Sequence, residues 1–185
     1  MISSLWLWMT LAVVLFWGVG VYNRLMRMRA RGAAALRSVD KHMRQCVKLV
    51  NLHASHATAQ RGSFASDVSD DESPNWLRLL ELLQTLDQAL KDAKGAPLAS
   101  PSVARVGQAF ESIQTAWRQW CIDAPDAMVS GAPGVMRLQW DAATLKAQAA
   151  RAGLNQILSK YNEAIEEFPA RLLVGFMGFK PAELM

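Results

Sequence analysis

The sequence predicts an all-α protein, in which an N-terminal transmembrane helix continues into an antiparallel up-down four-helix bundle. Three observations predict this fold class. Residues 5–22 (LWLWMTLAVVLFWGVGVY) form an apolar run without a charged side chain. Four segments after this run repeat apolar residues at the spacing of an α-helix. No window alternates apolar and polar residues between turn signals, as a β-strand would.

The apolar run is long enough to be a membrane anchor. Eighteen residues at about 1.5 Å per residue cross most of a bilayer's hydrocarbon core as a helix, and only a helix pairs its own backbone amides there. Trp6, Trp8, Trp17 and Tyr22 flank the run as interfacial aromatic residues do. No basic residue precedes it and no small-residue cleavage site follows, so residues 1–22 are interpreted as a retained anchor.

Basic residues follow the anchor directly and predict its orientation. Arg24, Arg27, Arg29 and Arg31 come first, and residues 1–60 carry eight Lys or Arg against one acidic residue, whereas the remainder carries twelve basic and fifteen acidic residues. A juxtamembrane basic excess stays on the cytoplasmic side, so we expect the N-terminus outside and the body in the cytoplasm. The same charges attract anionic lipid headgroups. Nucleic-acid binding is not predicted, because no base-reading motif accompanies them.

The bundle is assigned to residues 23–169. The anchor helix is expected to continue to about residues 56–60, followed by an acidic loop over 61–75 and helices over 76–94, 102–122 and 135–168. Short linkers between amphipathic helices favour antiparallel neighbours. The residues expected to face inward are Leu36, Val39, Met43, Cys46 or Val47, Val50 and Ala54 in the first helix; Leu79, Leu80, Leu83, Leu86 and Leu90 in the second; Val103, Val106, Phe110, Ile113, Trp117 and Trp120 or Cys121 in the third; and Leu138, Ala142, Leu145, Ala149, Leu154, Ile157 or Leu158, Tyr161, Ile165 and Phe168 in the fourth.

Residues 170–185 form an apolar C-terminal tail. The tail is too apolar to be left in water, so it docks on the bundle, rests on the bilayer interface or contacts another copy. Tyr-Asn pairs stand at both ends of the bundle, at Tyr22-Asn23 and Tyr161-Asn162. We hypothesise that these ends meet and that the amides bond across the first and fourth helices.

The sequence shows no catalytic constellation. It contains no nucleophile elbow, phosphate-binding glycine loop or dinucleotide fingerprint, so we predict no enzyme and no cofactor. His42, His53 and His56 lie near Cys46 on one side of the first helix, at the edge of its core face. They are interpreted as structural residues, with a metal site as the alternative. Both cysteines should be reduced in a cytoplasmic body.

The chain resembles the LemA family of bacterial proteins. The residues that carry the resemblance are Tyr22, Asn23, Arg151, Asn155, Tyr161, Asn162, Ile165, Phe168 and Pro169, with Gly178-Phe179 following. The resemblance implies a membrane-anchored bacterial protein with an N-terminal membrane helix and a four-helix bundle. It supplies no catalytic residues.

The predicted function is therefore a non-enzymatic interaction or scaffold module at the cytoplasmic face of a bacterial cell membrane. We expect a single-pass protein that is a homo-oligomer or binds a protein partner. A self-assembling, membrane-associated coat is the alternative, suggested by the basic residues and the apolar tail. An unrecognised enzyme or metal-binding protein using His53 and His56 is the second alternative.

Overall fold

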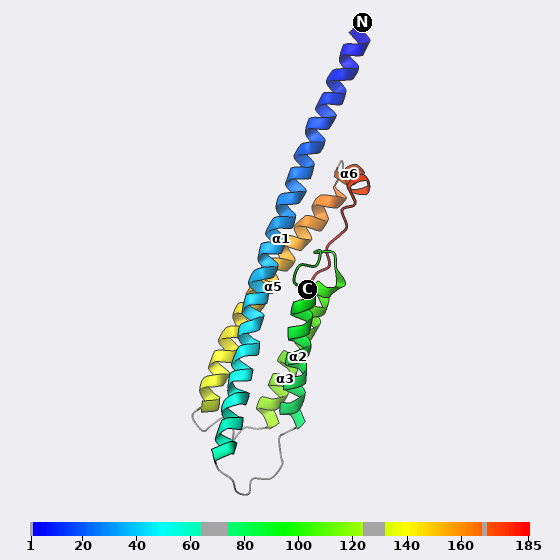
Figure 1. The fold of residues 1–185 in the computed structure, drawn as a ribbon. Coiled ribbons are helices and arrows are strands. Elements are labelled where there is room, and N and C mark those ends of the chain that lie inside the picture. Colours follow the sequence, from blue (N-terminus) through cyan, green and yellow to red (C-terminus); the bar gives the residue numbers. More distant parts are fainter. Residues whose placement is uncertain (1, 64–73, 124–131, 168–169) are drawn as a thin grey trace.

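The computed structural model describes residues 2–63, 74–123, 132–167 and 170–185, and these form helices without a strand (Figure 1). The helices are α1 (Ile2–Ser63), α2 (Pro74–Ala93), α3 (Pro101–Asp123), α5 (Ala132–Glu166) and the short α6 (Ala170–Met177). In Figure 1 the chain descends along α1, returns along α2, descends along α3 and returns along α5. α5 lies beside α1, and α2 lies beside α3. The all-α prediction is confirmed over these residues.

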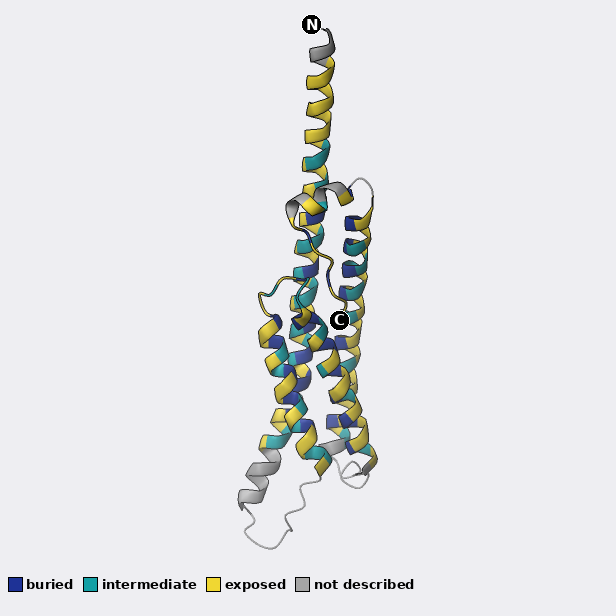
Figure 2. Cartoon of the chain, turned by 90° about the vertical axis from the view of Figure 1, so that its right-hand side faces the viewer, coloured by how far each residue is buried: buried dark blue, intermediate teal, exposed yellow. Residues whose placement is uncertain are grey.

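α1 is one continuous helix with two different surroundings. Its N-terminal part is apolar and exposed, with Phe16 at 84% exposure, whereas its core residues begin at Leu25, which is 2% exposed. Figure 2 shows this exposed part extending beyond the other helices. Within Trp6–Ser55, α1 holds one stretch long and apolar enough to span a membrane by length and composition. The apolar stretch and the core are therefore parts of a single rigid element.

Gly32 does not interrupt α1, although glycine weakens a helix by about 1 kcal/mol relative to alanine. Its backbone is in close contact with the loop between α2 and α3. A Cβ atom at this position would lie 2.7 Å from Leu98 Cδ1 and 3.6 Å from Leu158 Cδ2. The missing side chain thus makes room for Leu98 against α1.

The core-facing stripe of α5 differs from the predicted one. The predicted residues Leu138 and Leu145 are 72% and 68% exposed, and Ala142 and Ala149 are exposed too. The buried residues are Met136, Trp140, Ala143 and Ala147 instead. The N-terminal half of α5 carries two apolar stripes, and the one containing the bulky Trp140 is buried, because that ring stacks on Trp117 of α3 at 4.5 Å. From Leu154 onward the prediction is correct for Leu158, Tyr161 and Ile165, and Phe168 lies outside the described residues.

A row of rings joins the four long helices at the end opposite α6. His53 of α1 contacts Trp76 of α2 edge-on at 5.9 Å, Trp76 lies 5.0 Å from Trp120 of α3, and Trp120 lies 5.1 Å from Trp117. The row ends on Trp140 of α5. Aromatic pairs at these distances add about 0.5–1.5 kcal/mol each beyond the area they bury, so the row fixes the relative positions of all four helices.

A half-buried charge network joins α1 to α2. Arg44 donates to Asp40 within α1 and to Asp87 of α2, both at 2.8 Å, and Lys91 lies 2.8 Å from the second oxygen of Asp87. The hydrogen bond from Lys91, helped by Arg44, lowers the pKa of the Asp87 carboxyl below its usual 3.8. The network sets the register of these two helices.

Candidate functional site

The C-terminal segment (residues 179–185) turns back from α6 and runs along α5 toward the middle of the helices (Figure 1). Gly178 makes the turn with a φ of +67°, a left-handed conformation that glycine adopts without steric cost. The Phe179 N–H donates to the carbonyl of Val174 at 3.3 Å, which closes the end of α6 as a Schellman cap does. The turn directs the segment into a site built by α5, α3 and α1.

Two asparagines of α5 hold the backbone of the C-terminal segment. The Asn162 amide donates to the carbonyl of Ala182 and accepts from its N–H, both at 2.8 Å. Asn155 makes the same pair of bonds with Met185, again at 2.8 Å each. The asparagines are seven residues apart, which is two helical turns, so both amides project from the same side of α5. Each amide satisfies a main-chain donor and acceptor at once.

Arg151 extends this row by one more turn. Its Nε atom donates to the main-chain oxygen of Met185 at 2.9 Å. Its Nη2 atom lies 2.6 Å from the Glu111 carboxylate of α3. The Arg151 side chain is 22% exposed. Because a guanidinium presents several donors in a fixed plane, one arginine here connects α5, α3 and the end of the segment.

The end of the segment next to α6 is held by aromatic and cationic contacts. The Tyr161 hydroxyl donates to the carbonyl of Lys180 at 3.2 Å, and burial raises the pKa of this phenol above its usual 10.0. The Phe179 ring lies edge-on to Tyr22 at 6.1 Å and carries the Arg29 guanidinium over its face at 5.1 Å. These contacts tie the segment to α1 directly beyond its exposed apolar part.

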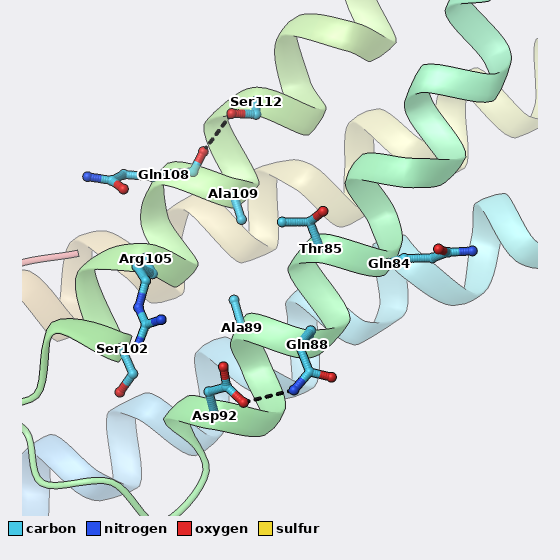
Figure 3. Close-up of a pocket in the computed structure, with 10 residues that line it drawn as sticks. All are labelled: Gln84, Thr85, Gln88, Ala89, Asp92, Ser102, Arg105, Gln108, Ala109 and Ser112. Atoms are coloured by element: carbon cyan, nitrogen blue, oxygen red, sulfur yellow. Dashed lines mark hydrogen bonds between the residues drawn. The ribbon is translucent and has the colours of Figure 1, made fainter.

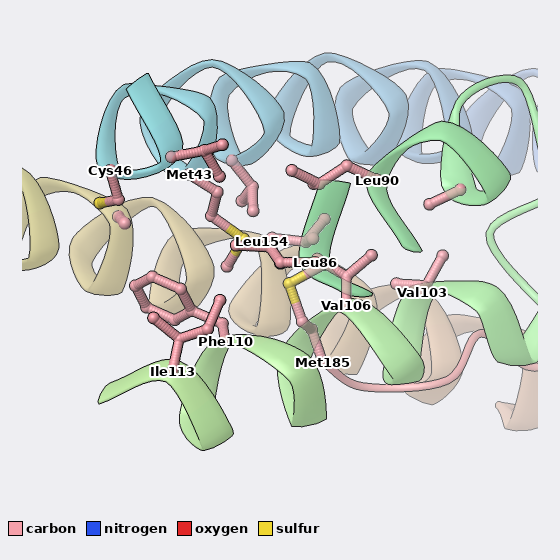
Figure 4. Packing of buried hydrophobic residues seen from close by; sticks show 14 of the residues in the cluster. Met43, Cys46, Leu86, Leu90, Val103, Val106, Phe110, Ile113, Leu154 and Met185 are labelled. Carbon is pink, nitrogen blue, oxygen red and sulfur yellow. The ribbon is translucent and has the colours of Figure 1, made fainter. Parts of the chain in front are cut away.

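Gly107 of α3 lets the end of the segment approach the core. A Cβ atom on Gly107 would lie 2.7 Å from the Met185 carbonyl carbon and 2.9 Å from its Cγ. Met185 is 7% exposed, and in Figure 4 its side chain points into the cluster containing Leu86, Val106 and Leu154. The site therefore combines a main-chain clamp on α5 with an apolar pocket that closes on α3.

The buried residues of the segment are Phe179, Ala182 and Met185, whereas the residues between them are exposed. Burial of every third residue matches the polyproline II conformation, which has three residues per turn, since a β-strand would bury every second residue. The asparagines contact only main-chain atoms, so the side-chain selectivity of this site rests on its pockets. Chemically, the site is suited to holding an extended polypeptide.

The structure brings together five of the family-like residues and corrects the role proposed for one pair. The residues that contact the C-terminal segment are Tyr22, Arg151, Asn155, Tyr161 and Asn162. The hypothesis that Asn162 bonds across to the first helix is wrong, because both ends of its amide are bonded to Ala182. The main-chain carbonyl of Asn23 accepts from Arg27 Nε within α1 at 3.3 Å. Tyr22 and the α5 end do approach each other, with Phe179 between them. Phe168 and Pro169 lie outside the described residues.

Sequence reasoning did not identify Gly107 or Glu111 as part of this site. The available signals were weak. Gly107 interrupts the core-facing stripe of α3 next to Val106, where a small residue suggests close approach by another backbone. Glu111 follows one turn later on the same helix.

The four arginines after the apolar stretch have different surroundings. Arg24, Arg27 and Arg31 are exposed, whereas Arg29 is half-buried against Phe179. Arg24 lies 3.9 Å from Glu167, with both side chains more than half exposed, so this pair contributes little to stability. Three of the four charges are thus exposed to solvent.

The histidines occupy separate local environments. His42 Nδ1 lies 3.3 Å from Gln45 Oε1, His53 belongs to the aromatic row, and the side chain of His56 lies outside the described part. Where side chains are described, no three His, Cys, Asp or Glu residues gather as a metal site requires.

A second concave surface lies between α2 and α3, with a volume of about 620 Å³. Figure 3 shows its lining, which includes Gln84 and Gln88 from α2 and Arg105 and Gln108 from α3. Gln88 donates to Asp92 at 2.9 Å across one turn of α2. The surface is open, most of the residues that line it have polar side chains, and it shares no residue with the site of the C-terminal segment.

Cys46 provides a pH-dependent test of the core. Burial raises the pKa of its thiol from 9.0 to about 11. A raised folded-state pKa means that the stability is complete below pH 9 and is lost as pH rises toward 11. We expect the free energy of unfolding to fall by about 1.4 kcal/mol between neutral pH and pH 10 from this thiol alone. Denaturant titrations of the wild type and Cys46→Ala should show a steeper alkaline decline for the wild type, and equal declines would contradict the assignment.

The chain matches no protein-family model, no curated protein and no solved structure. The resemblance to the LemA family therefore stays a prediction that rests on the residues named for it.

Proposed function

We propose that this chain is a single-pass membrane protein of the LemA type, in which an antiparallel up-down four-helix bundle acts as a non-enzymatic interaction or scaffold module at the cytoplasmic face of a bacterial membrane. The observation that carries the proposal is the continuity of α1. The same helix that exposes Phe16 and its apolar neighbours buries Val39, Met43 and Val50 in the core. Exposed apolar area of this extent is typical of a surface covered by lipid or protein.

The site of the C-terminal segment supports a binding role. Its polar side chains satisfy main-chain groups of an extended polypeptide. The Tyr161 hydroxyl, whose pKa is raised by burial, donates to the carbonyl of Lys180 rather than facing a cleft. A scaffold that binds its own segment in this way uses a mode suited to other extended segments, since main-chain recognition does not depend on side-chain identity.

A self-assembling coat is the second candidate. It is favoured by Leu138 and Leu145, which face outward from α5 although they would be expected inside a monomer. Such residues suit a protein contact.

Charge reversal next to the apolar stretch tests the membrane proposal. The variant combines Arg24→Glu, Arg27→Glu and Arg31→Glu, and leaves Arg29 on Phe179. We expect the wild-type body to be digested by protease in inside-out vesicles only, and the variant to lose this single orientation, because basic residues fix the cytoplasmic side.

The matched control reverses three exposed basic residues of the body: Lys94→Glu, Arg105→Glu and Lys160→Glu. It changes net charge equally and should keep the wild-type orientation. A wild-type protein released from membranes by alkaline carbonate, or digested only in right-side-out vesicles, would refute the proposal.

A further inference from the structure

The N-terminal half of α5 carries an apolar stripe on its solvent side, here called the outer stripe. Val135, Leu138 and Leu145 are 55%, 72% and 68% exposed, and the alanines that complete the stripe are exposed as well. The outer stripe consists of Val135, Leu138, Ala142, Leu145, Ala149 and Ala152. Its spacings are alternately three and four residues, the heptad pattern of a coiled-coil seam.

The outer stripe is separate from the core. Trp140, Ala147 and Leu154 are buried on the other side of α5, against α1 and α3. With Val135 as heptad position a, the leucines fall at d and these core residues at f, which is nearly opposite the a/d seam. α5 therefore has two apolar faces, and the helices of this chain cover only one.

Charges beside the outer stripe indicate what covers it. Asp141 occupies a g position and Lys146 the e position five residues later, and both are exposed. In a parallel, in-register pair, position g of one helix lies beside the following e of its partner. Two copies would thus form two reciprocal Asp141–Lys146 pairs. An antiparallel pair sets g beside g and e beside e, which gives no such match.

The residue types in the seam also favour a second copy of this chain in parallel orientation. The first heptad of the seam has valine at a and leucine at d, the combination that favours two parallel strands, and alanine fills the other two a positions and the last d position. Two copies anchored in one membrane through α1 also present α5 in the same direction. This step rests on the proposed membrane function. A seam of three heptads is short, but confinement to one membrane raises the effective concentration of a second copy.

We infer that the outer stripe of α5 is the seam of a parallel, in-register homodimer, flanked by reciprocal Asp141–Lys146 contacts. The two-fold axis of this dimer runs between the two α5 helices, parallel to both. Such an axis leaves both α1 helices pointing into the same bilayer and both C-terminal segments in their own sites.

Disulfide crosslinking of the full chain in native membranes tests the seam. In a Cys121→Ser background, which leaves the buried Cys46, Leu138→Cys and Leu145→Cys should each give a disulfide-linked dimer on oxidation. Gln84→Cys, exposed on α2, is the matched control and should stay monomeric. Co-expressed Leu138→Cys and Ala149→Cys chains distinguish the directions. Eleven residues separate these positions by about 16 Å along a parallel pair, beyond disulfide reach. An antiparallel seam sets position d of one helix opposite position a of its partner, so a mixed disulfide would show an antiparallel pair and overturn the inference.

Charge exchange tests the flanking contacts. Asp141→Lys in the Leu145→Cys chain should lower the crosslinked fraction about tenfold, since two attractive pairs become repulsive. Adding Lys146→Asp should restore it. Failure of the double exchange to restore crosslinking, or adducts formed only with a different protein, would refute the seam. A protein that stays in the membrane pellet without crosslinking refutes only the seam, whereas a protein absent from the pellet refutes the membrane proposal as well.

Discussion

Replacing Gly107 with alanine is expected to expel the end of the C-terminal segment from its site. The new methyl group would lie 2.7 Å from the Met185 carbonyl carbon, closer than nonbonded carbons approach. The segment can move away only by withdrawing the Met185 side chain from the core and breaking its bonds to Asn155 and Arg151. Overpacking of this kind costs about 1–3 kcal/mol, which outweighs the gain of up to about 1 kcal/mol from alanine in a helix.

The measurement is hydrogen–deuterium exchange of residues 179–185, together with denaturant unfolding. The Met185 N–H, which is bonded in the wild type, should exchange much faster in Gly107→Ala. Gly153→Ala on α5 is the matched control, because nothing lies within 4 Å of its Cβ position. This control should be stabilised by up to about 1 kcal/mol. Unchanged exchange at Met185 in Gly107→Ala would show that α3 does not close the site.

Removing both asparagine clamps is expected to destabilise the protein further. Asn155→Ala and Asn162→Ala together delete four hydrogen bonds to the segment. At about 0.5–1.5 kcal/mol per bond, the double variant should lose about 2–6 kcal/mol. The two single changes should not add, because each loosens the same segment.

Thermal or denaturant unfolding measures the loss, and exchange at the Ala182 and Met185 amides locates it. Asn51→Ala, at an exposed position of α1, controls for the helix propensity of alanine. Asn155→Asp keeps an acceptor for the Met185 N–H but sets a carboxylate oxygen against the Met185 oxygen, so it should be no more stable than Asn155→Ala. A double variant as stable as the wild type would contradict a structural role for the clamps.

The helices could be predicted from local pattern alone, because capping residues and apolar periodicity are properties of neighbouring positions. The core face of α5 could not. Its first half has two apolar stripes, one with Leu138 and Leu145 and the other with Trp140. Periodicity alone does not show which stripe faces the core. The choice depends on Trp117, a partner in another helix. The prediction became correct where only one stripe remained, from Leu154 onward.

The candidate site could be located from the sequence but not explained. Arg151, Asn155, Tyr161 and Asn162 were named by the resemblance to the LemA family, and only the Asn162 amide was given a partner, which was placed on the first helix. Their actual partners are main-chain atoms of residues 180–185. Main-chain groups are the same at every residue, so no side chain in the segment identifies them. The sequence signal that remains for this segment is an apolar residue at every third position, at Phe179, Ala182 and Met185.

The unbroken α1 fixes a distance as well as a direction. From residue 23 to residue 55 the helix rises about 50 Å at 1.5 Å per residue, and the aromatic row joins its far end to α2, α3 and α5. In a chain held in a bilayer, this end stands at a set height above the headgroups. A tilt of the membrane helix by 10° would swing it sideways by about 9 Å. In such a chain, a tilt of α1 in the lipid would therefore be transmitted along one helix to the aromatic row at its far end.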